Sequence, residues 1–134
     1  IKRELYEKFG YYNTDLGRKG SSLIGAEDKD MFNRLKNNNI ACYYFPDIPI
    51  FHHIPEYKTT DDFFNRLTYS IGKSERIRTK STSGNEYYKR IFQEGVKWAA
   101  SLILFVGYTR TFLPAKGSRL LIFRKNVTKE LLGK

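Results

Sequence analysis

The stretch Thr59–Ser74, TTDDFFNRLTYSIGKS, carries the clearest helical pattern of the 134-residue chain. A threonine at 59 or 60 can cap the first turn, and aspartates at 61 and 62 place negative charge where it complements the helix dipole. Apolar residues then recur at helical spacing, at Phe63, Phe64, Leu67 and Ile71. The stretch predicts a long helix that starts near residue 60 and is bent or interrupted at Gly72. It separates a mixed front part from an all-helical rear part.

The rear part is predicted to be helical and strongly basic. The polar segment TKSTSGN at 79–85 predicts a linker, and two more helices are expected at about 86–113 and 116–132. Residues 58–134 contain 16 Lys and Arg against 6 Asp and Glu, whereas residues 1–57 contain 8 of each. The formal charge of +10 therefore arises in the rear part, which indicates an anionic partner: nucleic acid, phosphates or a membrane surface.

The front part is predicted to be mixed. Helical patterns at 1–9 and 27–36 flank a segment with glycines at 17, 20 and 25. Two apolar runs separated by a Pro-Asp pair predict short strands, at 40–45 (IACYYF) and 48–51 (IPIF). Because two strands do not make a stable sheet, we expect them to extend a larger sheet supplied by upstream sequence.

Three acids open the second helix, in the segment Ile24–Leu35 (IGAEDKDMFNRL). Carboxylates in a first helical turn stabilise the helix by roughly 0.3–1 kcal/mol each, which is one sufficient reason for Glu27, Asp28 and Asp30. The alternative is a catalytic base. Gly25 lets a ligand approach the backbone, and a carboxylate at a helix start can take a proton from a hydroxyl within hydrogen-bond reach. The segment alone leaves both interpretations open.

Two further groups of residues have a structural and a functional interpretation. One of His52 and His53, at the end of a predicted strand, can complete a divalent metal site; otherwise they are half-buried, hydrogen-bonded histidines. Cations between residues 58 and 78 alternate with aromatic residues and can neutralise a diphosphate; otherwise they form a solvated helix face. These cations are Lys58, Arg66, Lys73, Arg76 and Arg78.

Taken in order along the chain, these features resemble the C-terminal portion of a family 2 glycosyltransferase. The resemblance rests on residues 6–35 (YEKFGYYNTDLGRKGSSLIGAEDKDMFNRL), 43–54 (YYFPDIPIFHHI) and 59–74. The matching positions are Phe9-Gly10, Glu27-Asp28, Arg34-Leu35, Pro46, His52, and Gly72 with Ser74. The match covers residues 1–76, and residues 77–134 are similar only in being helical and basic.

The resemblance implies an α/β fragment: the C-terminal part of a GT-A nucleotide-diphospho-sugar transferase fold, mostly helical with a few short strands. Residues 1–76 would form the acceptor-side, catalytic-base part, and residues 77–134 a basic amphipathic helical tail. The donor-binding half, with its Asp-x-Asp metal motif, would lie upstream. We therefore expect this chain to be inactive alone.

The implied reaction is the inverting transfer of one sugar from a nucleotide-sugar donor to a hydroxyl of a saccharide or lipid-linked acceptor, in polysaccharide or glycolipid synthesis. By the same resemblance Asp28 would be the general base and Glu27 would orient the site or bind acceptor. His52 would approach a Mn²⁺ or Mg²⁺ ion held mostly by the upstream half. The predicted substrate-binding residues are Gly25, Lys58, Arg66 and Lys73. The Gln-x-x-Arg-Trp motif of processive members is absent, which predicts transfer of single sugars.

Charge and cysteine content indicate where the chain works. A cationic amphipathic helix within 96–132 is expected to bind an anionic membrane surface, with each Lys or Arg there contributing about 1 kcal/mol. The lone Cys42 excludes an internal disulfide and fits a cytoplasmic location, peripheral on the cytoplasmic face of the membrane. The competing interpretation is a noncatalytic module that binds a membrane surface or nucleic acid. No recognition motif for nucleic acid is present and the acids at 27–30 fit that interpretation poorly, so no nucleic-acid partner is expected.

Overall fold

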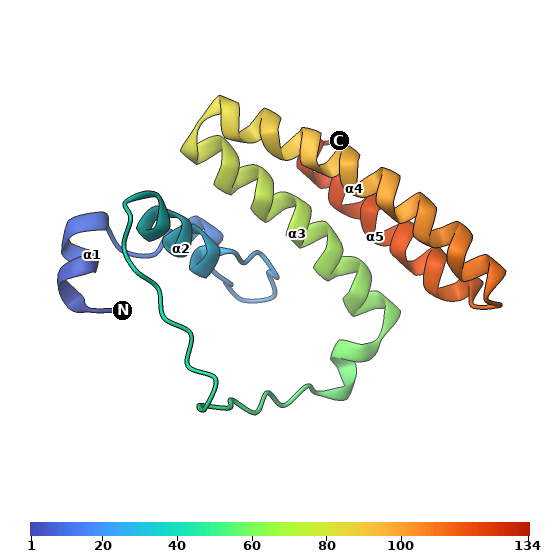
Figure 1. Ribbon diagram of the computed structural model, residues 1–134, viewed down its shortest axis with the longest axis horizontal. Helices are drawn as coiled ribbons and strands as arrows, with labels where there is room; N and C mark the ends of the chain where they lie inside the picture. The colour runs from blue at the N-terminus through green and yellow to red at the C-terminus, as the bar shows by residue number, and fades with distance from the viewer.

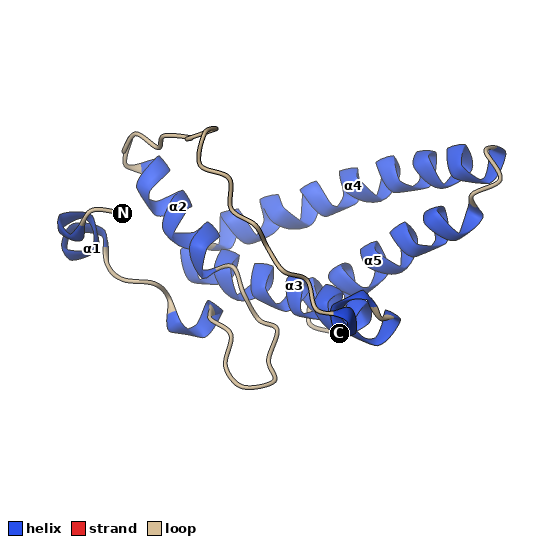
Figure 2. Cartoon of the chain, turned by 90° about the horizontal axis from the view of Figure 1, so that it is seen from below, coloured by secondary structure: helices blue, strands red, loops and turns tan.

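The computed structural model describes all of residues 1–134, and its regular structure is entirely helical (Figures 1 and 2). The predicted helices are confirmed, with ends that differ by a few residues. In order, the elements are α1 (Arg3–Phe9), the 3₁₀ turn η1 (Thr14–Leu16), α2 (Glu27–Asn37), the 3₁₀ turn η2 (Glu56–Thr59), α3 (Asp61–Thr82), α4 (Gly84–Arg110) and α5 (Pro114–Leu132).

The predicted strands are wrong, and so is the α/β fold class. Residues 40–45 and 48–51 form no strand, and every residue from 41 to 54 is exposed. A strand needs a neighbour that pairs with its amides and carbonyls. Here the chain between α2 and η2 runs as a long loop (Figure 1), in which residues 41–54 make no backbone hydrogen bond to another segment, although the first of them line a pocket with the start of α1. Its aromatic and β-branched residues therefore remain in an extended coil, and no sheet exists for them to join.

Helices α3, α4 and α5 run antiparallel to their neighbours along the chain, and α5 packs against both of the others (Figure 1). The predicted linker at 79–85 is mostly helical, because only Ser83 separates α3 from α4. Ser83 is extended, which ends α3, and its side chain accepts a hydrogen bond from the Glu86 N–H, which caps α4. Ser83 is thus both the C-cap of α3 and the N-cap of α4. None of the helices combines the length and apolar character that crossing a membrane requires.

Gly72 does not bend or interrupt α3, contrary to the sequence prediction. Its role is to let α5 approach. A Cβ atom at this position would overlap the Val127 carbonyl oxygen and lie 2.8 Å from the Cβ of Glu130. Gly117 on α5 has a similar role, because a Cβ there would lie 2.7 Å from Cδ2 of Phe105. Both glycines are sites of close helix packing.

The interior contains more polar than apolar side chains, nine against five. Since buried polar groups need partners, polar contacts between the helices contribute much of the packing. The buried apolar side chains form two small groups: Leu16, Met31 and Leu35 around α2, and Val127 and Leu131 on α5.

Two buried glutamates connect four helices. Glu75 of α3 accepts hydrogen bonds from Lys29 of α2 and from Nε of Arg90 on α4, the latter at 3.0 Å. Arg90 also donates to Glu94 at 2.7 Å, and the second oxygen of Glu94 accepts from Arg124 of α5 at 2.8 Å. We call this chain of contacts the Glu75–Glu94 network. It ties α2 to the three long helices.

Candidate functional site

The acids predicted to be functional lie in the first turn of α2, directly after a strained residue. Ala26 has φ 108° and ψ 11°, in the left-handed region, and provides no side-chain cap for the helix. A residue other than glycine in such a conformation costs on the order of 1–3 kcal/mol and persists only where its surroundings hold it. Such strain is typical of functional sites, so the start of α2 is a candidate site.

Two anchors hold Ala26 in place, one on each side of it. Before it, the Gly25 N–H donates to Oγ of Ser74 on α3 at 3.1 Å, and the Ser74 hydroxyl in turn donates to the Ser70 carbonyl. After it, Lys29 binds Glu75, the residue next to Ser74. The turn is therefore fixed to one short segment of α3 at both ends.

The three acids of α2 differ in their partners. Asp30 pairs with Arg34 at 3.1 Å, and Arg34 also donates to the carbonyls of Phe9 and Tyr11. This arrangement is structural, because it attaches the end of α1 to α2. The side chains of Glu27 and Asp28 make no hydrogen bond or ion pair within the chain, and Asp28 is exposed. These two carboxylates are free to bind something else.

A cluster of tyrosines at the end of α1 lies within range of the negative charge of the free carboxylates. The rings of Tyr6 and Tyr11 stack with centroids 5.7 Å apart, and the Tyr12 ring lies 5.8 Å from Tyr6. The pKa of Tyr12 is raised, first by its interaction with the Tyr6 hydroxyl, then by slight desolvation and the negative charges of its surroundings, which include Asp28 and Glu27. The cluster was not predicted, although its signal is visible in the sequence as one tyrosine shortly before Phe9-Gly10 and two directly after it.

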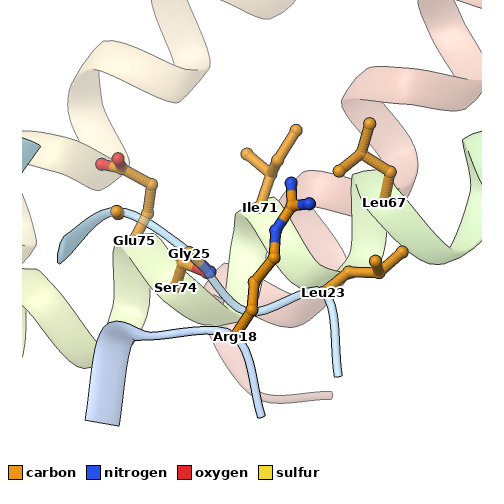
Figure 3. Close-up of a pocket in the computed structure, with 8 residues that line it drawn as sticks. Arg18, Leu23, Gly25, Leu67, Ile71, Ser74 and Glu75 are labelled. Atoms are coloured by element: carbon orange, nitrogen blue, oxygen red, sulfur yellow. The ribbon is translucent and has the colours of Figure 1, made fainter. Parts of the chain in front are cut away.

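A cavity of about 230 Å³ opens behind the same turn (Figure 3). Its walls come from the loop before α2 and from one face of α3, and they are part apolar and part charged. This volume is below the roughly 300–1,000 Å³ typical of pockets for drug-sized ligands, and it suits one small ring. The lining residues are Arg18, Leu23, Gly25, Ala26, Leu67, Ile71, Ser74 and Glu75.

Burial and positive charge act in opposite directions on Glu75, at one end of this cavity. Desolvation by burial acts to raise the pKa of its carboxyl group. Hydrogen bonds and positive charge from Lys29 and Arg78 outweigh this effect and lower the pKa to about 2. Glu75 is therefore charged at neutral pH and fully engaged, so its role in the cavity is structural.

The other predicted site residues are not gathered at the start of α2. Arg66 approaches it most closely, because it donates to the carbonyl of Ser21 in the glycine-containing loop at 3.2 Å. Lys58 lies in η2, and Lys73 is exposed on α3. His52 is exposed in the coil before η2. None of these four hydrogen-bonds or pairs with Glu27 or Asp28.

The residues of the chain do not assemble a metal site. No group of three or more His, Cys, Asp or Glu side chains is placed to hold an ion. Mn²⁺ and Mg²⁺ need several oxygen ligands in regular geometry, which His52 in an exposed coil does not provide. The metal implied by the resemblance does not fit these residues, so no chemical step is derived through it.

No family model, curated protein or solved structure matches this chain. Its function is therefore inferred from its own residues and their geometry.

Proposed function

We propose that this chain supplies the catalytic base and the acceptor-side surface of an inverting glycosyltransferase, with Asp28 as the base. The observation that carries the proposal is the free carboxylate of Asp28 in the first turn of α2, directly after the strained Ala26 and within a segment anchored to α3 on both sides. The ordered motifs that resemble family 2 glycosyltransferases support the same assignment.

The proposed chemistry needs one proton transfer and one displacement. Asp28 takes the proton of an acceptor hydroxyl as its oxygen attacks the anomeric carbon of the donor sugar. The new carbon–oxygen bond forms on the face of the anomeric carbon opposite the nucleoside diphosphate. The bond to the nucleoside diphosphate breaks, the diphosphate leaves with the electron pair, and the configuration inverts. A carboxylate takes up the proton in its charged form.

The surroundings of Asp28 support a saccharide as acceptor. Sugar rings present C–H faces that pack on aromatic rings, and their hydroxyls need hydrogen-bond partners. The tyrosine cluster offers both an aromatic surface and hydroxyl groups within range of the negative charge of the carboxylates. Glu27, also without a partner in the chain, is suited to bind a second acceptor hydroxyl. The cavity behind Gly25 has room for one further ring.

The donor side is proposed to come from sequence outside these 134 residues. The nucleotide and its metal ion are proposed to bind there, because no group of three or more His, Cys, Asp or Glu side chains in this chain is placed to hold an ion. Arg66, which holds the loop before α2, is the predicted cation best placed to approach a leaving diphosphate. In this proposal residues 1–134 alone bind acceptor but do not turn over donor.

The test compares Asp28→Asn with Asp47→Asn, because both aspartates are exposed and form no ion pair, and Asp47 lies in the coil before η2. Sugar transfer is measured on the full-length protein that contains this chain, with a panel of labelled nucleotide sugars and soluble saccharide acceptors. We expect Asp28→Asn to lower kcat by about 10²–10⁴-fold, the usual contribution of a general base, and Asp47→Asn to leave it unchanged. Three results would overturn the proposal. They are full activity in Asp28→Asn, equal losses in both variants, and no transfer by the unsubstituted full-length protein with any donor.

A further inference from the structure

Helix α4 carries an apolar surface that no other part of the chain covers. Phe92, Val96, Ile103 and Val106 are separated by four, seven and three residues and so share one face of the helix, and Phe92 and Ile103 are 74% and 73% exposed. The opposite face of α4 packs inward, through the buried residues Arg90, Glu94 and Ser101. The exposed apolar face therefore points away from α3 and α5.

The turn between α4 and α5 continues this surface. Phe112 has φ 58°, a left-handed conformation, and its side chain is 92% exposed. Leu113 beside it is also exposed. Both views of the chain place this turn at the end farthest from α1 and α2 (Figures 1 and 2). We call the outer face of α4 together with Phe112 and Leu113 the apolar tip.

The charged side chains that α4, the turn and the first part of α5 place beside the apolar tip are positive. Residues 95–129 contain no Asp or Glu. Arg110 and Lys116 are exposed on either side of the turn and form no ion pair within the chain. Arg119 and Arg124, farther along α5, pair with Asp61 and Glu94 and do not add to the free charge. The surface thus combines large exposed apolar side chains with unneutralised cations.

We propose that the apolar tip docks the chain on an anionic membrane surface. Phe112 and the outer face of α4 enter the boundary between headgroups and acyl chains, while Arg110 and Lys116 contact lipid phosphates. An apolar surface of this kind beside cations is what interfacial helices use, and the helix lies on the membrane because it is not built to cross it. This inference does not depend on the proposed sugar transfer.

The charge also argues against a second copy of the chain as the occupant. A symmetric dimer through the apolar tip would pair the same patch on both subunits and bring Arg110 and Lys116 close to their own copies. Like charges facing one another across an interface are unfavourable, and no acid in this region would neutralise them. An anionic lipid surface satisfies both the apolar and the charged components.

The test is sedimentation of the chain with vesicles of phosphatidylcholine alone or mixed with phosphatidylglycerol. Binding is expected only with the anionic vesicles, and it should weaken as salt is raised. Phe112→Asn removes the ring with a residue that tolerates positive φ, and it should weaken binding on the order of tenfold. Phe51→Asn is the matched control, because Phe51 is 95% exposed but lies in the coil before η2. Lys116→Gln should weaken binding about fivefold.

Three results would overturn the proposal: no binding to anionic vesicles, equal binding to both vesicle types, or equal losses in Phe112→Asn and Phe51→Asn. Analytical ultracentrifugation without lipid tests whether a second copy of the chain binds the apolar tip. A dimer that Phe112→Asn dissociates would assign the apolar tip to a second copy instead. Transfer to soluble acceptors is measured separately, so a failure here is distinguishable from a failure of the proposed function.

Discussion

Two pairs of carboxylates in this chain have opposite surroundings. Glu75 and Glu94 are buried among the long helices, and their oxygens accept hydrogen bonds from cationic side chains of four helices. Glu27 and Asp28, at the start of α2, have no partner in the chain. The first pair holds the structure together, and the second is left available for a ligand. All four side chains are carboxylates, so partners and burial, not the type of group, indicate the difference in role.

The two pairs are also connected. Lys29 joins the Glu75–Glu94 network one residue after Asp28, and Ser74, next to Glu75, holds Gly25. The buried pair therefore helps to keep Ala26 in its strained conformation and the free pair in a fixed position. Each of the next predictions changes one side of this comparison.

The largest effect is expected from Glu75→Gln. Removing the charge of Glu75 leaves the buried Arg78 without a counter-charge and Arg90 with Glu94 alone, and an uncompensated buried charge typically costs about 3–5 kcal/mol. Urea unfolding measures the free energy, with Glu56→Gln as the control because Glu56 is exposed and unpaired. A change in Glu75→Gln no larger than the control's would mean that the network does not support the fold.

Lowering the pH should remove the stability that the charged carboxylate of Glu75 contributes. The folded pKa of Glu75 is about 2, below its ordinary value of 4.5, so its stabilising effect is complete above pH 4.5 and is lost as the pH falls toward 2. As the pH is lowered, the urea concentration at the midpoint of unfolding should therefore fall more steeply for the unsubstituted protein than for Glu75→Gln. Parallel curves for the two proteins would contradict this assignment.

A smaller effect of opposite sign is expected from Ala26→Gly. Glycine adopts the left-handed conformation without strain, so the variant should be more stable by about 1 kcal/mol. Ala99→Gly is the control, because Ala99 is exposed within α4 and glycine there should destabilise by roughly 0.5–1 kcal/mol. If both variants lose stability alike, Ala26 is not strained.

Local sequence signals predicted the parts of the fold that depend on neighbours along the chain. The start of α3 follows from the capping residue Thr60. Helix α2 follows from the periodicity that places Met31 and Leu35 on one face. The strands failed because a strand depends on a partner that no local pattern guarantees. Gly72 was misread for a related reason, since the segment that packs on it lies more than fifty residues later.

The candidate site was predictable in part. Gly25, Glu27 and Asp28 form a local motif, and the structure keeps them together at one turn. Their lack of partners was not visible, because Asp30, two residues later, looks the same in sequence and yet is paired. The Glu75–Glu94 network joins residues from four helices, so no spacing rule points to it.

The most direct test of the contrast between the two pairs is the free energy of unfolding of Asp28→Asn, measured with its sugar-transfer rate. The account predicts a loss of stability of no more than about 1 kcal/mol, the value of one charge at a helix start, together with loss of transfer. A large loss of stability would show that Asp28 supports the fold as Glu75 does. Unchanged stability with unchanged transfer would show that this carboxylate is not the base.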